Sequence, residues 1–593
     1  TIWLYLASGT TVSLSYTAII LFYFLTRAYG KPLSRQETFI IFVLVTGLAG
    51  YDLSVNLALN LIMRGYYKIS PITWSFINPA TARPIPLDLG SWYAPPLDSD
   101  VYLLRTVWHP DWLLPALLTV GSSFLMWGVS MSMGFLTYQL YVVQEKLPFP
   151  AAQVPAEAVI SLTSKKSKPT LYFSALLSVI YSSILYGLPL LTGFSRLVLP
   201  IPWFDLSTSI ESFLPGASLG FATDLSGMIF AFIIPSSVVV WNFIGSMGFY
   251  FIGNHIATKY FPPGYGWSPG MSLTFSYQWS SIYLWLNPTI GIGIAVAVVP
   301  LLKNPRIIIN AIKSLGVKSS EGRLLSLKYI LLMYFGCAGG LIWMTHTIAP
   351  NFPLTILIPL YAVGPFFLSL ILTRLLGESG MLITGSAYLQ QGAILASGYS
   401  GADIWYCYTF AIYGGGQYWC NDFKICDLTG TSKKSYILTI ILSSVIGWVS
   451  SFVFMSIFWG MAPIPSGAYP MTEINLPISA ALQGLWATGK AVSINPQAIL
   501  IACAASAIAD IGFSYVRIPF SLVGLATGVG SPPTPNLLVG FVISQVLKKI
   551  KGEQWWKENR YTIVAGYVIG LSVVIALFAS LGMMFKGMNM MPY

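Results

Sequence analysis

Acidic side chains inside apolar segments are the residues most able to do chemistry in this 593-residue chain. Asp52 lies in GYDLSVN, Asp224 in FATDLSG, and Asp510 follows AASAIA. A charge in such a segment costs a few kcal/mol and is seldom kept without a use. A carboxyl group in a low dielectric has a raised pKa and can carry a proton. Asp224 and Asp510 are therefore our main candidates for proton coupling, whereas an interhelical hydrogen bond is the stronger interpretation for Asp52.

Uncharged polar side chains in the same regions could bind the amide and carboxylate groups of a small substrate. The same residue types also hold membrane helices together through interhelical hydrogen bonds, so both interpretations stay open for each of them. These candidates for a substrate cavity are Asn242, Asn287, Tyr388, Gln390, Gln391, Tyr413 and Gln417.

Motifs for metal, redox or nucleotide chemistry are missing from the sequence. It has three histidines and five cysteines, with no HExxH sequence and no CxxC pair. Gly484–Lys490 has the glycine and lysine spacing of a P-loop, but Ala491 stands where Ser or Thr would bind Mg²⁺. We therefore expect no metal site, no cofactor and no enzymatic activity. Energy for any transport would come from an ion gradient or from the gradient of the substrate.

The composition requires that these residues be held within a membrane. Charged residues make up 9% of the chain, against roughly 25% in soluble domains, and hydrophobic residues make up 55%. The mean hydropathy is +0.70. A soluble globule of this size could not cover its surface with so few charges. The chain is predicted to be an all-α polytopic protein of the cell (plasma) membrane, with 1–593 as one transmembrane domain and the lipid bilayer as its surroundings.

Apolar runs of about 20 residues are needed to cross a hydrocarbon core about 30 Å thick. We expect roughly 13–16 crossings, depending on how many broken segments only re-enter the membrane. Clear spans are predicted at Ile2–Leu25, Thr38–Met63, Leu113–Val143, Leu171–Leu191, Ile282–Leu302, Leu327–Met344, Leu354–Leu372, Tyr436–Trp459, Pro496–Ala509 and Thr562–Met584. Discontinuous spans are predicted at Gly216–Pro235 with Ser236–Ile256, Gly380–Ala396 with Ile404–Gly414, Leu476–Thr488, and Ile518–Leu547.

Lysine and arginine collect in alternate loops, which predicts the orientation. Residues 303–328 form such a basic loop and are placed in the cytoplasm. The loop 64–110 is rich in Pro, Trp and Tyr and is placed outside, either as a folded cap over an entrance or as an interfacial anchor. Thr1 then also lies outside, and we expect a further N-terminal helix before it. The net charge of +11 reflects this bias, so no nucleic-acid partner is expected.

Glycine and proline interrupt several of these apolar segments, most densely at 148–155, 215–235, 287–293, 414–416 and 524–535. Irregular backbone at membrane depth is tolerated where it is buried or lines a water-filled cavity. Glycines alternatively let helices pack closely. With so many interruptions, we favour a cavity lined by discontinuous helices.

One stretch resembles an element of the oligopeptide transporter superfamily, which includes peptide transporters and the yellow-stripe metal–chelate carriers. Asp422-Phe423-Lys424 is followed by Leu428-Thr429-Gly430 and by Ser432, similar to that family's DFK-x-G-x-L-T-x-S-P-R. Lys433-Lys434 replaces the family's Pro-Arg.

Further matches follow in the family's order along the chain. They are Leu33–Glu37 before Thr46–Gly50, Leu147–Pro150 with Ala156–Ala158, the segment Gly220–Gly245, and Arg374 with Glu378 in RLLGESG. Arg374 and Glu378 can also form an ordinary ion pair at a helix end. The resemblance implies a divergent prokaryotic or archaeal relative: a secondary transporter of about 16 helices that imports peptides or amino-acid-derived compounds with protons by alternating access. Carriers of this size often form homodimers.

Two other functions stay open. A non-catalytic integral subunit of a larger membrane complex would suit the aromatic content of 15%. An intramembrane lipid-linked transferase would use Asp224 or Asp510, but it would need paired acids or a metal site at the membrane interface.

Overall fold

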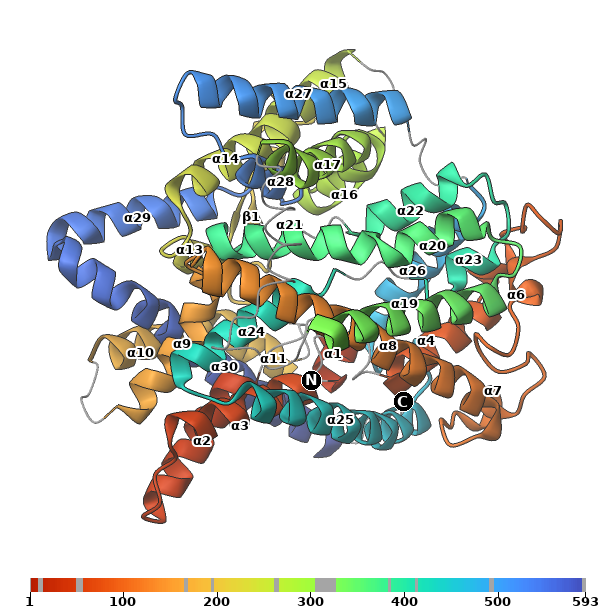
Figure 1. Cartoon of the computed structure of the whole chain (residues 1–593), viewed down its shortest axis with the longest axis horizontal. Helices are drawn as coiled ribbons and strands as arrows, with labels where there is room; N and C mark the ends of the chain where they lie inside the picture. The colour runs from red at the N-terminus through yellow and green to blue at the C-terminus, as the bar shows by residue number, and fades with distance from the viewer. Residues whose placement is uncertain are drawn as a thin grey trace.

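The computed structural model describes residues 2–8, 14–49, 57–164, 169–192, 197–260, 266–303, 327–381, 386–410, 414–489 and 495–588. Within these ranges almost all regular structure is helical, and one pair of short strands is the exception. The helices stack into a single body, with the short helices α6 and α7 at one edge (Figure 1). The predicted all-α polytopic membrane class is confirmed.

The first half of the chain carries many short helices beside a few long ones. They are α1 (Ile2–Ser8), α2 (Ser15–Ala28), α3 (Arg35–Ala49), α4 (Leu57–Ile69), α5 (Pro71–Trp74), α6 (Ile85–Asp88), α7 (Val101–Leu104), η1 (Pro110–Trp112), α8 (Leu113–Thr137), α9 (Pro150–Thr163), α10 (Pro169–Ser182), α11 (Leu188–Thr192), α12 (Ser207–Ile210), α13 (Ser226–Phe230), α14 (Ser236–Ser246), α15 (Asn254–Tyr260), α16 (Leu273–Tyr283) and α17 (Leu286–Lys303).

The second half has longer helices. They are α19 (Leu327–Ile348), α20 (Leu354–Ala362), α21 (Gly364–Ser379), α22 (Ser386–Ala396), α23 (Asp403–Tyr406), α24 (Gly416–Thr429), α25 (Lys433–Met461), α26 (Pro470–Ala487), α27 (Pro496–Tyr515), α28 (Leu522–Val529), α29 (Asn536–Lys551) and α30 (Glu553–Met588). Three segments are π-helical: η2 (Tyr138–Gln144), η3 (Ser183–Gly187) and η4 (Met247–Gly253).

Eight helices within the described residues are long and apolar enough to cross a membrane, or up to nine if the bent pair α16 and α17 counts as one span. A number of 13–16 crossings would need shorter helices to cross in pieces, and it stays a prediction. The eight are Pro110–Gln144, Pro169–Thr192, Ser236–Tyr260, Lys328–Ile348, Leu354–Ser379, Lys433–Met461, Pro496–Tyr515 and Glu553–Phe585.

Two predicted spans are described only on either side of a gap. Ile2–Leu25 holds α1 and α2, with residues 9–13 between them outside the described residues, and Thr38–Met63 holds α3 and α4, with residues 50–56 and so Asp52 outside the described residues. Gly216–Pro235 holds strand β2 (Gly220–Ala222), paired antiparallel with β1 (Trp203–Asp205), and then the single turn of α13. This segment was predicted as part of a discontinuous span, and the strand within it was not predicted, because its backbone is satisfied by the side chain of the distant Asn536.

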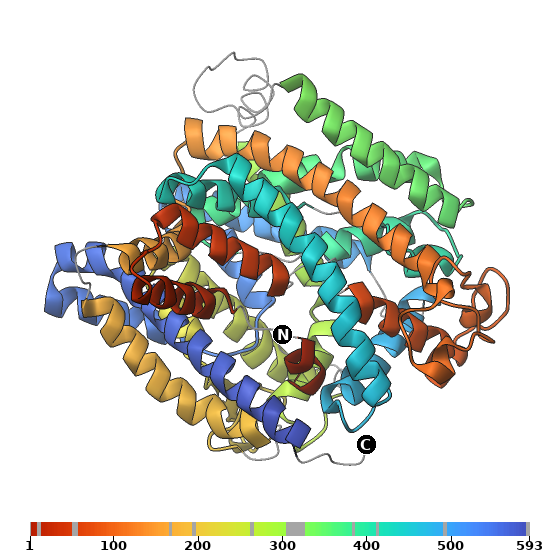
Figure 2. The same ribbon diagram turned by 90° about the horizontal axis from the view of Figure 1, so that it is seen from below.

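Long helices pack side by side through small residues. The views in Figures 1 and 2 both show α19 along α8, and the pair α10 with α30 is among the most extensive contacts. In the stretch 524–535, a Cβ at Gly528 would overlap the backbone carbonyl of Asn242 on α14. Here the glycines serve close helix packing, the alternative to a cavity.

The predicted outer loop 64–110 is folded. It contains α5, α6 and α7, and its apolar side chains join a buried cluster with α4, α25 and α26 that includes Tyr93, Val101, Trp112 and Trp459. We call residues 70–112 the cap. Most of the predicted basic loop 303–328 lies outside the described residues.

Candidate proton-coupling site

Asp224 lies between β2 and α13, where the backbone is neither strand nor helix. Its carboxylate accepts three hydrogen bonds. The Tyr186 hydroxyl donates to Oδ2 at 2.7 Å, the Ser226 backbone N–H to Oδ1 at 2.6 Å, and the Tyr567 hydroxyl to Oδ1 at 3.4 Å. A partly buried carboxylate is thus held by neutral donors from three separate segments.

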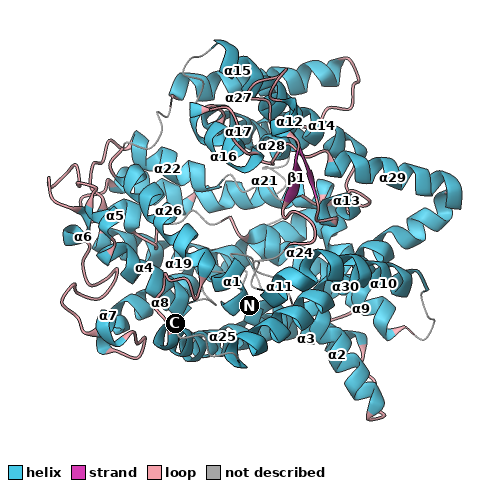
Figure 3. Ribbon diagram, turned by 180° about the vertical axis from the view of Figure 1, so that it is seen from behind, coloured by secondary structure: helices cyan, strands magenta, loops and turns pink. Residues whose placement is uncertain are grey.

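Polar side chains bond to the backbone groups at the edge of the strand pair. Asn536, at the start of α29, accepts from the Ala222 N–H at 2.8 Å and donates to the Ala222 carbonyl at 2.7 Å. Thr223 donates to the carbonyl of Pro202 at 3.0 Å. Because unpaired backbone groups are costly away from water, these bonds let irregular backbone persist among helices (Figure 3).

The tyrosines come from two long helices that pack on each other. Tyr186 lies in the π-helical turn η3 of the span Pro169–Thr192, and Tyr567 lies on α30. The Ser178 hydroxyl of α10 donates to the Tyr567 carbonyl at 2.6 Å and ties the two helices together. Tyr181 donates to the Thr223 carbonyl at 2.7 Å. A π-helical turn is often found at functional sites, and here it carries a direct partner of Asp224.

This arrangement can accommodate both protonation states of Asp224. The ionised carboxylate accepts from two hydroxyls, while a protonated one can donate to a tyrosine oxygen after the hydroxyl rotates. Within the described residues no Lys or Arg forms an ion pair with Asp224. All the hydrogen bonds described for Asp224 thus come from neutral donors.

Asp510 is in a different environment. Its Oδ2 lies 2.5 Å from Lys303 Nζ, and the same ammonium donates to Ser514 at 2.9 Å. The pair joins α27 to the end of α17, at a helix whose apolar side chains are largely exposed. The geometry is therefore that of an ion pair between two helices, and it differs from that of Asp224, which has no cationic partner among the described residues.

Three of the substrate-cavity candidates form hydrogen bonds with other parts of the protein. Asn242 donates to Thr527 at 3.0 Å between α14 and α28, and Gln390 donates to the Phe410 carbonyl. Asn287 accepts from the Asn495 N–H at 3.0 Å. The Tyr388 side chain and the whole of Tyr413 are outside the described residues.

Gln391 and Gln417 differ, because each has a buried side-chain oxygen with no hydrogen-bond partner within the described part of the chain. Gln417 follows Gly416 on α24, and Gly416 packs on Ser369 of α21 and on Met133 of α8. Ser369, Thr373 and Asn421 also carry unpartnered buried oxygens in α21 and α24. Buried polar groups are nearly always paired, so this row of oxygens marks a place that water or a substrate can satisfy.

The residues of the family-like motif lie beside that row. The Tyr436 hydroxyl donates to Asp422 at 2.6 Å, and burial raises the pKa of Asp422 to about 6. Phe423 stacks on Phe135 with ring centroids 5.1 Å apart. Lys424 follows on the same helix, one turn after Asn421 and two turns after Gln417.

Arg374 forms the ion pair with Glu378 at 2.8 Å that the sequence predicted for a helix end. It also contacts Glu145 at 3.2 Å, beyond the end of η2. The two carboxylates share one guanidinium, which ties α21 to the segment that follows α8.

Sequence reasoning did not find Tyr181, Tyr186, Tyr567 or Asn536. The sequence contains no signal for their meeting at Asp224, since Tyr567 and Asp224 are 343 residues apart. Tyrosines inside otherwise apolar spans were the available hint.

Comparison with models of known protein families finds no match, and no curated protein matches the chain in sequence. The chemistry of the described residues therefore has to carry the functional argument.

Proposed function

We propose that the protein is a secondary active transporter of the cell membrane that imports oligopeptides or related amino-acid-derived compounds together with protons. The proposal agrees with the resemblance to the oligopeptide transporter superfamily. The observation that carries it is Asp224, a carboxylate at a break in the helical frame, bonded by tyrosine hydroxyls and without a cationic partner among the described residues. Acidic side chains in such surroundings form the proton relays of pumps and transporters.

The protonation of Asp224 would change its contacts with three segments, η3, α13 and α30. The ionised carboxylate accepts from η3 and from α30, and it also accepts from the first turn of α13. Neutralisation weakens these charge-assisted bonds, which frees the segment around β2 and α13 from the two long helices. A proton bound from one side and released to the other would in this way bias alternating access.

The row of unpartnered oxygens on α21 and α24 supports a peptide-like substrate. The oxygens of Gln417 and Asn421 can accept from peptide N–H groups, and the hydroxyls of Ser369 and Thr373 can donate to peptide carbonyls. These are the polar groups that an oligopeptide presents along its length.

Uptake into proteoliposomes tests the proposal. Labelled dipeptide or tripeptide should accumulate when an inwardly directed pH gradient is imposed. Asp224→Asn should abolish that accumulation and leave exchange of labelled for unlabelled peptide intact. Normal gradient-driven accumulation by the variant would refute the role of Asp224. Turnover of a lipid-linked donor without uptake would instead identify a transferase.

A further inference from the structure

Two cations lie one turn apart on α4 beneath the cap. The Lys68 side chain is 4% exposed, and its ammonium donates to the Ala94 carbonyl at 3.1 Å. The Arg64 guanidinium donates to the Thr119 hydroxyl at 2.9 Å and lies 3.6 Å from the centre of the Tyr408 ring. Each of the two cations therefore donates to a neutral acceptor.

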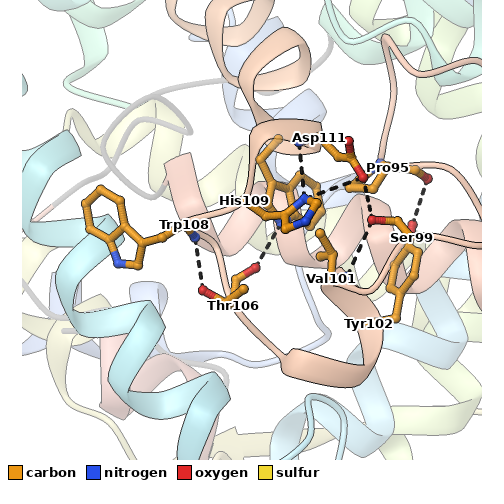
Figure 4. A network of polar contacts seen from close by, with 9 residues as sticks. Pro95, Ser99, Val101, Tyr102, Thr106, Trp108, His109 and Asp111 are labelled. Carbon is orange, nitrogen blue, oxygen red and sulfur yellow. Dashed lines mark hydrogen bonds and ion pairs between the residues drawn. The ribbon is translucent and has the colours of Figure 1, made fainter.

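Two of the four carboxylates of the cap, Asp88 and Asp111, bond to other groups, and Asp98 and Asp100 are exposed. Asp88 accepts from Asn78 at 2.6 Å and also from Thr81. Asp111 accepts from Ser99 at 2.5 Å and lies 3.4 Å from the His109 ring, as Figure 4 shows. Among the described residues, neither Arg64 nor Lys68 forms an ion pair.

Placing a buried cation one turn from a half-buried one without a counter-charge is unfavourable. Burial lowers the pKa of Lys68 and also that of Arg64. An arginine has five N–H donors and a lysine has three, so the neutral acceptors named above leave donors free. An anion that enters the cluster would satisfy these donors and compensate both charges.

The walls of the cluster are aromatic. Tyr93 interacts electrostatically with Arg64, and its ring meets Tyr406 edge to face, with centroids 5.5 Å apart. The Tyr406 side chain is 3% exposed, and its hydroxyl has no hydrogen-bond partner within the described residues. Tyr408 lies against Trp92, with ring centroids 6.4 Å apart. An unpartnered hydroxyl group thus lies on the residue whose ring packs against Tyr93, and Tyr93 in turn interacts with Arg64.

The local fold keeps the cluster in place without the anion. Tyr102 donates to the Pro95 carbonyl at 2.9 Å, and the Trp112 indole donates to the Thr106 carbonyl at 3.1 Å. Asn78 accepts from the Ala402 N–H at 3.3 Å and fastens the cap to the segment that carries Tyr406. Since these bonds are made within the protein, the cations are preorganised for a ligand.

We propose that Arg64, Lys68 and Tyr406 form a binding site for the carboxylate of a small organic molecule, such as the terminal carboxylate of a peptide. The fork of one guanidinium matches a planar carboxylate, and the aromatic walls suit the apolar carbon next to it. The identification of the ligand as the transported peptide rests on the proposed function, whereas the anion site does not.

Binding to the purified full chain tests this site through the fluorescence of Trp92 and its neighbours. The probes are a dialanine peptide, the same peptide with an amidated C-terminus, acetate and inorganic phosphate. We expect dialanine to bind and acetate to compete, while the amidated peptide binds at least about 10-fold more weakly. Competition by phosphate but not by acetate, or equal binding of the amidated peptide, would overturn the proposal.

Three variants separate recognition from folding. Arg64→Gln should weaken dialanine binding about 100-fold, because it removes the guanidinium fork. Tyr406→Phe removes only a hydroxyl that bonds to no described residue, so it should keep the thermal stability of the parent and weaken binding about 10-fold. Arg83→Gln, in an exposed part of the same cap, is the matched control and should bind as the parent does.

The outcome for Asp224→Asn keeps the two proposals distinct. This variant should bind dialanine normally at the cap site even though coupling is lost. If Tyr406→Phe and Arg64→Gln both bind dialanine like the parent, the cap site is refuted while the role of Asp224 stands. If all of these variants bind as predicted but no pH-driven uptake occurs in the parent, the transport function fails and the anion site stands.

Discussion

Asp422 offers a quantitative test of how the centre of the protein is packed. Burial raises its pKa from 3.8 to about 6, and its carboxylate accepts from Tyr436, which is almost fully buried. Since the pKa is higher in the folded state, the folded protein binds the proton more tightly than the unfolded chain does. This stabilisation is complete below pH 3.8 and is lost as the pH rises through about 6.

The difference between the two pKa values corresponds to about 3 kcal/mol, and about 2 kcal/mol of it should be gained between pH 7 and pH 4. The perturbation is Asp422→Asn, whose amide keeps the size and an acceptor for Tyr436 but does not titrate. The stability of the parent relative to this variant should therefore rise by about 2 kcal/mol as the pH falls from 7 to 4.

Chemical unfolding in mixed micelles of dodecyl maltoside and SDS, followed by circular dichroism at each pH, measures this difference. Asp427→Asn is the matched control, because Asp427 lies on the same helix but is ion-paired with Lys433 at 2.6 Å. A free-energy difference between the parent and Asp422→Asn that stays constant from pH 7 to pH 4 would refute the buried placement of the carboxyl group.

Three further predictions concern single contacts. Tyr186→Phe removes the 2.7 Å hydrogen bond to Asp224, so pH-driven uptake should fall about 10-fold while counterflow exchange is kept. An equal loss of uptake and of exchange would show that Tyr186 has only a structural role. Gly528→Ala should lower the free energy of unfolding by about 2 kcal/mol, because its Cβ would overlap the Asn242 carbonyl. The control is Gly512→Ala, since Gly512 has open space around it. Equal stability of the two variants would contradict the close packing of α14 on α28. Asp510→Asn should cost less than about 1 kcal/mol and leave gradient-driven uptake intact, since Lys303 is partly exposed; loss of accumulation would return Asp510 to the coupling site.

The class of the protein could be predicted from its sequence because hydropathy and the scarcity of charge act over the whole chain. Asp224 could be singled out for the same reason, as a carboxylate in an apolar segment. Its partners could not be predicted, because Tyr186 depends on a π-helical turn and Tyr567 on the packing of α30 against α10. Neither feature has a local sequence pattern.

Discontinuous segments were harder to predict than regular helices. The glycines at 216–235 correctly indicated an interrupted helix, but strand β2 depends on Asn536, which lies 314 residues away in sequence. The same glycine signal at Gly528 has a different meaning, since it lets α14 and α28 touch. The two cations of α4 were missed because Arg64 and Lys68 looked like the ordinary basic end of a helix before an outer loop.

Proton movement is the most direct test of the central claim that Asp224 couples proton flow to substrate. Proteoliposomes that hold a pH-sensitive dye should acidify inside when dialanine is added outside, without any imposed pH gradient. Liposomes that carry Asp224→Asn should show peptide exchange and no such acidification. Equal acidification with the parent and with Asp224→Asn would contradict the account.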